Sequence, residues 1–326
     1  MLNAYFCHDG RLRRSAQPVS GETLRASVWI DLVRPDPVEI EQVARATQLH
    51  VPTEAEVSEI ESSSRLVTRQ GVLYLSLPLI NRSDGPHTTS AGFVLSRTHL
   101  MTVRFHDSRL FDGFADQVPH GEIPQETAAH VLVSLLEAIV DRQADVLEQV
   151  RADLDTMSNR IFAMGTRASS GRKQEDAALR AALGEIGRIG DLLSHVRDTQ
   201  MGIARLVPYV QSVARSWLPA DLAPRLDTLS QDIASIGSFD IYVSEKLQFL
   251  LDATLGFINI AQNNVMKVLT VASVVGIPPV LVAGIYGMNF KYMPELGWTW
   301  GYAFGWAMII LTALIPLAVF RWRKWI

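Results

Sequence analysis

The segment Tyr286-Gly287-Met288-Asn289 decides how the chain is read, because it separates two long apolar runs near the C-terminus. The first run extends from Val265 to Tyr286 and the second from Tyr302 to Phe320. Each run is about as long as a helix must be to cross the hydrocarbon core of a bilayer. Two such runs in succession predict a transmembrane helical hairpin that carries this segment at its tip.

The tip continues as Met293-Pro294-Glu295-Leu296, and a basic, aromatic tail follows the second run. Tyr-Gly-Met-Asn and Met-Pro-Glu-Leu between two terminal spans resemble the CorA family of bacterial magnesium and cobalt transporters. The similarity is looser at Trp29-Ile30-Asp31-Leu32 and at Gly256-Phe257-Ile258-Asn259, but with them it covers the whole chain. The zinc-transporting branch of the superfamily resembles this hairpin too, so zinc transport stays open as an alternative, although Met-Pro-Glu is not expected in its loop.

Charge is distributed unevenly along the chain. Residues 1–264 contain 33 acidic and 25 basic side chains, a net charge of −8, whereas the whole chain has −4. This balance disfavours nucleic acid as a partner and suits divalent cations. The single cysteine, Cys7, excludes an internal disulfide and a cysteine-based zinc site. No motif for a nucleophile–base pair, a nucleotide loop or a metal cluster is present, so the sequence predicts neither an enzyme nor a cofactor.

Basic residues predict the orientation of the hairpin. Arg321, Arg323 and Lys324 follow the second span, and Lys246 and Lys267 precede or enter the first. The positive-inside rule then places both termini in the cytoplasm and the loop 287–301 outside. The two spans are expected to contact membrane lipid. With the family resemblance, the location implied is the bacterial inner membrane.

The soluble region is predicted to contain an α/β domain at residues 1–124, followed by an antiparallel helical pair at 125–220. Alternation and β-branched residues predict strands at Val28–Leu32, Val72–Leu77, Ala91–Leu95 and Leu100–Phe105. Helices are predicted at Pro37–Leu49 and at Thr53–Ser62, the second with a capping box formed by Thr53 and Glu56. The helical pair is predicted to run from Thr127 to about Gly165 and to return from Glu175 to Ser216, with Pro208 disturbing the second helix.

A stalk helix that continues into the first span is predicted at 221–286, then the external loop 287–301, the second span 302–320 and a basic tail 321–326. From Pro224 to Tyr286 the stalk would measure about 95 Å if it is continuous. Two helices with a break near Gly237 are the alternative. The family resemblance favours the single stalk.

Two spans per chain cannot enclose an aqueous path, so a transporter of this kind must be a closed ring of subunits. The resemblance implies a funnel-shaped homopentamer in which the first span lines the pore. Steps of three and four residues from Asn263 define one helical face, composed of Asn263, Met266, Leu269, Ser273, Ile277, Val280 and Gly284. By spacing alone, Met266 and Leu269 fit equally well as packing residues against the second span. The resemblance favours an apolar gate.

The outer ion site is assigned to Gly287, Met288 and Asn289. Magnesium dehydrates reluctantly, so a ring of neutral oxygens from Asn289 could hold the hydrated ion through its waters. Gly287 is expected to allow a tight turn after the helix, and Met288 to pack the loop. Asn289 also fits as a helix C-cap. Glu295 would attract cations to the mouth, or be a solvated loop charge opposed by Lys291.

Mg²⁺ is predicted as the substrate and, through the family resemblance, as a regulatory ligand that favours the closed ring. The candidate regulatory acids are Glu56, Glu59 and Glu61 on one side and Asp227 or Asp232 on the stalk. Thr228 stands where the resemblance would place a stalk acid. Glu56 also fits as nothing more than the capping residue of its helix.

Two further readings remain at this stage. Gly301 and Gly305 form a Gly-x-x-x-Gly pair that suits close helix packing.

A membrane-anchored sensor, with the hairpin as a mere anchor, is the alternative from another functional class. An anchor needs neither a second span nor a polar tip, and both argue against it. Preference among Mg²⁺, Co²⁺, Ni²⁺ and Zn²⁺ is not encoded in a site that reads hydrated ions.

Overall fold

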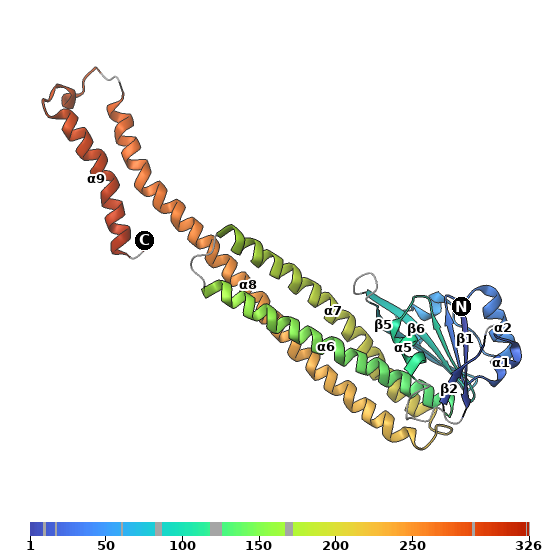
Figure 1. Ribbon diagram of the computed structural model, residues 1–326. Helices are drawn as coiled ribbons and strands as arrows, with labels where there is room; N and C mark the ends of the chain where they lie inside the picture. Colours follow the sequence, from blue (N-terminus) through green and yellow to red (C-terminus); the bar gives the residue numbers. More distant parts are fainter. Residues whose placement is uncertain are drawn as a thin grey trace. The chain divides into compact units, whose positions relative to one another are not determined.

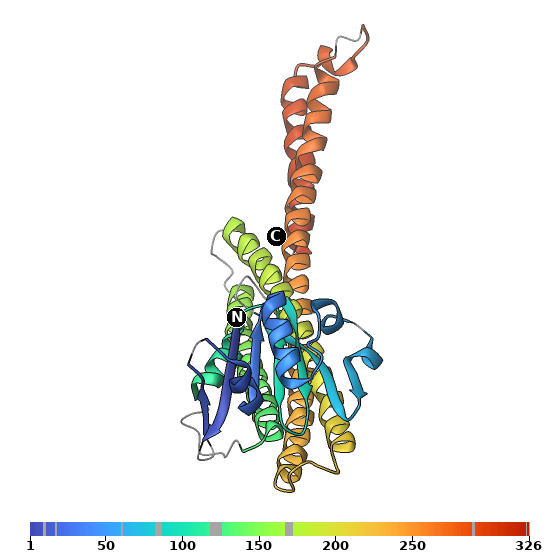
Figure 2. The same ribbon diagram turned by 90° about the vertical axis from the view of Figure 1, so that its right-hand side faces the viewer.

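The computed structural model describes residues 1–8, 11–16, 18–59, 61–81, 87–117, 126–166, 172–288, 291–323 and 325. The tertiary contacts divide the chain into two compact units. The first unit comprises Met1–Arg160 with Leu183–Leu250, and the second comprises Ile161–Ala182 with Leu251–Ile326. Figures 1 and 2 show the sheet in blue and cyan, the long helices in green to orange, and the last helix in red.

The first unit contains a seven-stranded sheet in the order β2-β1-β3-β7-β6-β5-β4. The strands are β1 (Leu2–His8), β2 (Arg11–Arg14), β3 (Trp29–Val33), β4 (Leu66–Arg69), β5 (Val72–Asn81), β6 (His87–Leu95) and β7 (Leu100–Arg104). The pair β3–β7 is parallel, and the other five pairs are antiparallel. The four predicted strands, β3, β5, β6 and β7, are confirmed. The strands β1, β2 and β4 were missed, because each is short or lies near an edge and lacks clear alternation.

Helices cover both faces of this sheet (Figure 2). The helices α1 (Gly21–Ala26) and α2 (Pro37–Thr47) lie on one face, and α5 (Arg109–Gln117), α6 (Ala128–Thr166), α7 (Arg172–Val213) and the start of α8 (Leu222–Tyr286) lie on the other. Successive side chains of β3 alternate between the two cores, with Trp29 facing α5 and α6 and Ile30 facing α1 and α2. The α/β fold class is therefore confirmed.

The helix predicted at Thr53–Ser62 is only one turn long. The helix α3 spans Glu54–Val57, and a second single turn, α4, spans Ser62–Arg65. The capping box itself is confirmed, because the backbone N–H of Thr53 donates to the Glu56 carboxylate at 2.8 Å. The helix ends early because serines follow it, which favour turns over helix, and because the Val57 carbonyl accepts a hydrogen bond from Ser76 of β5.

The helix α8 is continuous over 65 residues, so the predicted single stalk is confirmed and the alternative break near Gly237 is wrong. Gly237 lies inside the helix. The absence of a side chain there leaves room for Gln200 of α7, which donates to the Ile233 carbonyl at 3.1 Å. The helix α7 continues through Pro208, and α8 continues through Pro278 and Pro279.

Ion pairs fix the register of the three long helices within the first unit. Residues of α6 meet residues of α8 in parallel order, and α7 runs antiparallel to both. The pairs are His130–Asp221, Glu137–Arg225, Asp155–Lys246 and Arg197–Asp240. This register leaves α8 packed between α6 and α7 up to the end of the unit.

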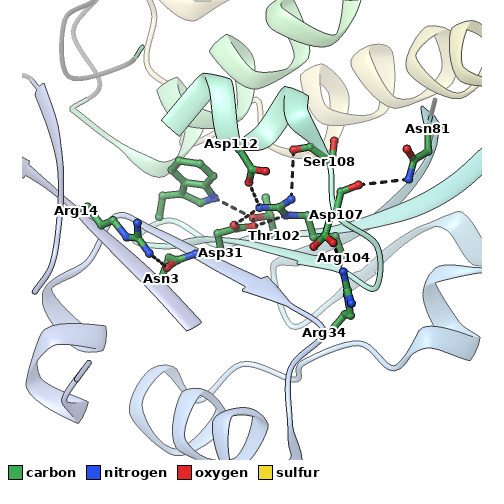
Figure 3. Close-up of polar contacts among 11 residues, drawn as sticks. Asn3, Arg14, Asp31, Arg34, Asn81, Thr102, Arg104, Asp107, Ser108 and Asp112 are labelled. Carbon is green, nitrogen blue, oxygen red and sulfur yellow. Dashed lines mark hydrogen bonds and ion pairs between the residues drawn. The ribbon is translucent and has the colours of Figure 1, made fainter. Parts of the chain in front are cut away.

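A buried ion pair joins β3, β7 and α5 (Figure 3). Arg104 donates to Asp31 at 3.0 Å and to Asp112 of α5 at 2.7 Å, and the side chains of Arg104 and Asp31 are only 6% and 3% exposed. Thr102 donates to Asp31 at 2.8 Å, and the Trp29 indole donates to Thr102 at 3.0 Å. Burial alone would lower the pKa of Arg104, but the Asp31 carboxylate raises it above its ordinary value, so the guanidinium stays charged.

The Arg104→Ala variant is expected to lose much of the stability of the first unit, because Asp31 would be left charged and buried without a cationic partner. Such a loss is on the order of 3–5 kcal/mol. Arg34→Ala is the matched control, since its ion pair with Asp107 is exposed on both sides. Thermal melting of both purified variants measures the difference. Equal melting temperatures for the two variants would contradict a structural role of the buried pair.

Candidate functional site

The second unit carries two helices that are long and apolar enough to cross a membrane, the C-terminal part of α8 and α9 (Gly301–Trp322). No residue in the apolar window of either helix is buried. Apolar surface of this extent is not left in water by a folded protein. The two helices must therefore be covered by lipid, by other chains, or by both.

The predicted pore face of α8 is exposed within the chain. Met266, Leu269, Ile277 and Val280 are 58%, 58%, 63% and 71% exposed. Asn263 and Gly284 are also exposed, and Ser273 is half-buried. The half-buried positions of the same segment lie on the opposite face of the helix, since successive residues are about 100° apart. These positions are Val271, Val275, Pro278, Pro279, Val282 and Tyr286. The packing alternative for Met266 and Leu269 therefore finds no support inside one chain.

The Asn263 end of this face borders a cavity of about 430 Å³. Asn263 and Met266 line it together with Lys267 and Trp325 of the tail. Trp325 is held there by stacking on Phe320, with ring centroids 5.7 Å apart. Polar and basic groups thus gather at this end of the face, whereas its middle is apolar.

The other end of the face is the tip of the hairpin. Asn289 lies outside the described residues. Met288 is 49% exposed, and its N–H donates to the Ile285 carbonyl at 3.2 Å. Gly287 continues the helical hydrogen bonds through a 3.0 Å bond to Ala283 and does not adopt a left-handed backbone. The expected turn after the helix is present at Gly287, but it is made without a left-handed backbone. A Cβ at this position would instead lie 3.2 Å from the Ala283 carbonyl oxygen, which is a tight contact.

The loop after the tip contains a short 3₁₀ helix, Pro294–Gly297. Glu295 is half-buried there, and its carbonyl accepts from Trp298 at 3.3 Å. Lys291 lies over the ring of Tyr292 at 5.9 Å. A Cβ on Gly301 would collide with the Glu295 carbonyl oxygen, whereas a Cβ on Gly305 would meet no atom within 4 Å. The two glycines therefore have different roles inside one chain.

The candidate regulatory acids lie on separate elements of the first unit. Glu56 is engaged by the capping box and by His50 at 3.1 Å, and the Thr53 backbone hydrogen bond lowers its pKa. Glu59 is exposed, and Glu61 precedes α4 without capping it through its side chain. Asp227 accepts from Gln211 at 3.0 Å. Among the described residues, no group of three or more histidine, cysteine or acidic side chains could hold a metal ion.

Asp232 lies near acids that sequence analysis missed. Asp141 of α6 has a raised pKa, caused first by partial burial and then by the charges of Glu137, Asp145 and Asp232. The signal in the sequence was the spacing of four residues between Glu137, Asp141 and Asp145, which places them on one face of α6. Negative charge on α6 therefore faces the stalk at this level.

Comparison with known proteins identifies relatives over the full length of the chain. A family model described as CorA-like Mg²⁺ transporter protein matches residues 25–323. The magnesium transport protein CorA of Yersinia pseudotuberculosis is 30% identical over 328 residues, which cover 100% of both chains.

Solved structures show the same fold. The complete CorA magnesium transporter from Methanocaldococcus jannaschii superposes with a TM-score of 0.77 at 17% identity, covering 100% of this chain and 99% of that chain. The cytoplasmic domain of ZntB from Vibrio parahaemolyticus superposes with a TM-score of 0.53 at 12% identity, covering 79% of this chain and 97% of that chain. At these identities, both likenesses are of fold alone.

The Gly301→Ala variant is expected to displace the loop before α9, because the new methyl group meets backbone rather than a movable side chain. Overpacking of this kind costs roughly 1–3 kcal/mol. Gly305→Ala is the matched control in the first turns of the same helix. The melting temperature and oligomeric state of both variants provide the measurement. Equal damage from Gly305→Ala would show that the pair acts in packing between helices, and that the loop contact is not the reason for Gly301.

Proposed function

Because this chain belongs to the CorA-like Mg²⁺ transporter family, we propose that it conducts Mg²⁺ into the cell through a pore lined by its first span. The observation that carries the proposal is the exposed face of α8 from Asn263 to Gly284, which is polar or glycine at its ends and mostly apolar between them. Family members are ion transporters, and no enzymatic step is assigned to this chain.

The pore requires several copies of the chain. One exposed face per chain, with the opposite face half-buried, suits a closed ring in which each copy turns the same face inward. We propose a homopentamer in the bacterial inner membrane, with both termini in the cytoplasm and residues 287–301 outside. Arg321 in the last turn of α9 and Arg323 just after it support this orientation. Lys267, near the start of the apolar run of α8, supports it as well.

The outer ion site is proposed at Asn289, with Gly287 and Met288 placing it. Five carboxamide oxygens could bind the hydrated ion through its first-shell waters without removing them, which suits an ion that dehydrates reluctantly. Glu295, half-buried in the loop, would add negative charge near the mouth. Co²⁺ and Ni²⁺, which carry the same charge, are proposed as further substrates.

The Asn289→Ala variant is expected to abolish Mg²⁺ uptake while the oligomer still assembles, because the site loses its oxygens and the helix does not depend on them. Thr299→Ala, an exposed polar change in the same loop, is the control and is expected to retain uptake. Uptake into vesicles, measured side by side for Mg²⁺, Co²⁺, Ni²⁺ and Zn²⁺, provides the readout. Normal uptake by assembled Asn289→Ala would rule out the outer site, and a preference for Zn²⁺ would favour the zinc-transporting alternative.

The gate is proposed at Met266, Leu269 and Ile277. Rings of these side chains would form narrow apolar segments that water avoids, so ions stop there when the pore is closed. A constriction of this type needs the side chains to be free of contacts within their own chain, and all three are more than half exposed.

The Leu269→Asn variant is expected to leak, because a polar ring allows the closed pore to fill with water. Val271→Asn is the matched control, since it adds the same group about 160° away on the half-buried face of α8. Flux at high internal Mg²⁺ is expected to rise for Leu269→Asn and not for Val271→Asn. If both variants change only expression, the gate lies on another face.

Regulation by internal Mg²⁺ is proposed at the boundaries between subunits. Acidic groups from neighbouring subunits repel one another there, and a divalent ion between them would favour the closed ring. The candidates are Glu56, Glu59 and Glu61 on one subunit and Asp227 or Asp232 on the next. Within one chain these acids lie on separate elements, so the proposed site is shared between two chains.

The double variant Glu59→Ala with Asp227→Ala is expected to weaken the inhibition of flux by internal Mg²⁺, while entry through Asn289 is retained. Glu41→Ala is the control, because Glu41 is an exposed acid of α2 paired with Arg45. Flux is measured as a function of Mg²⁺ inside the vesicle. An unchanged inhibition curve would place the sensor at other residues.

A further inference from the structure

A cavity of about 350 Å³ lies in the first unit between the sheet and the long helices, away from the proposed ion path. The end of β5, the start of α5, the middle of α6 and one residue of α7 form its walls. Figure 3 shows two of the lining residues, Asn81 and Ser108, with the 3.3 Å hydrogen bond from Asn81 to the Asp107 backbone carbonyl. The lining residues are Leu79, Ile80, Asn81, Ser108, Arg109, Leu110, Ile139, Arg142, Gln143, Val146 and Thr199.

The charge of this cavity is positive, although the soluble region as a whole is acidic. Arg109 and Arg142 line it, and the described lining contains no acidic residue. The one ion pair of Arg142, with Asp145, is long at 3.8 Å and more than half exposed on both sides, so it leaves the guanidinium available. Arg109 and Leu110 also begin α5, and Ser108 directly precedes it. The first-turn N–H groups of this helix have no partners inside the helix and favour an anion.

A buried amide adds a polar group to the wall of the cavity. Gln143 is only 3% exposed, and it donates one long hydrogen bond of 3.4 Å to the Val196 carbonyl. Because Gln143 lines the cavity, its carboxamide oxygen can accept a hydrogen bond from a molecule bound there.

The remaining walls are apolar. Leu79 and Ile139 are buried in the main core, and Val146 continues the same surface along α6. Convergent cationic and amide groups over an apolar floor are the usual composition of a site for a small molecule, and about 350 Å³ is near the lower end of the usual size range.

We propose that this cavity binds a small organic anion, in which one carboxylate or phosphate group is carried by an apolar body. The oxyanion contacts Arg109 and Arg142 at the mouth, next to the first turn of α5, and the apolar body contacts Leu79, Ile139 and Val146. Gln143 accepts a hydrogen bond from a hydroxyl or amino group of the ligand, or from a water molecule that the ligand retains.

The probes are phenyl phosphate and benzoate, with inorganic phosphate and benzyl alcohol as the matched half-ligands. Binding to the full-length protein in detergent micelles is measured by isothermal titration calorimetry in buffer without Mg²⁺. Phenyl phosphate or benzoate is expected to bind saturably at one site per chain. Each half-ligand is expected to bind at least about 10-fold more weakly, because it has lost either the charged contacts or the apolar contacts. The ratio of the dissociation constants of phenyl phosphate and benzoate distinguishes a phosphate site from a carboxylate site.

Arg142→Gln and Arg109→Gln are expected to weaken binding of the better probe by about 10-fold each, as expected for loss of a hydrogen bond between charged groups. Both arginines are exposed, so the variants are expected to fold. Arg151→Gln is the control, because Arg151 is an exposed arginine on the opposite face of α6. The proposal is overturned if neither probe binds saturably, if the double variant Arg109→Gln with Arg142→Gln retains binding, or if Arg151→Gln weakens it equally.

Discussion

No side chain in the apolar window of α8 is buried by the rest of the chain, and the fold depends on how this surface is removed from water. The same helix begins as an ordinary amphipathic element, with Leu222, Leu226, Leu229 and Ile233 buried at steps of three and four residues. Farther along, apolar side chains surround the helix and none in the apolar window is buried. Water cannot be the solvent of that segment. In the proposed function, a bilayer and neighbouring copies would supply the missing contacts, and the ion path would be formed by the face that each copy turns inward.

The α/β domain is held by a different kind of interaction. Its single parallel strand pair brings Asp31 and Arg104 together, and Arg104 reaches α5 through Asp112 and the Ser108 carbonyl. One guanidinium thus sets where α5 begins. That start forms one wall of the Arg109–Arg142 cavity, so the position of the cavity depends on a charge pair on the same face of the sheet. Tyr5 adds to this environment, because burial, followed by the charge of Asp31, raises the pKa of its hydroxyl to about 12 and keeps it neutral.

Features determined by one continuous stretch of sequence were predictable, whereas features determined by contacts between distant elements were not. The hairpin and the helical pair were predictable, because long apolar or periodic runs determine them. The continuous α8 was predicted from the family resemblance, since the sequence pattern also allowed a break near Gly237. The edge strands β2 and β4 and the neighbouring β1 were not predictable, because their pairing depends on neighbouring strands more than on their own sequence pattern. The roles of two glycines were not predictable either. Gly301 is needed because a Cβ there would collide with the Glu295 carbonyl oxygen, and Gly287 does not adopt a left-handed backbone. Spacing defined a face of α8, but only the family resemblance favoured pore lining over packing for its residues. The Arg109–Arg142 cavity could not be predicted, since its residues come from four elements that only the fold brings together.

The order of the elements along the chain has a consequence for biosynthesis. The core between the sheet and α1–α2 is complete once residue 105 has been made, and the core on the other face is complete at Ile233. The first apolar run begins only at Val265. Domains generally fold as units during synthesis, from the N-terminus onward. The nascent chain therefore contains every residue of the sheet and its two cores before the first apolar run leaves the ribosome, so these cores can form before that run reaches a membrane.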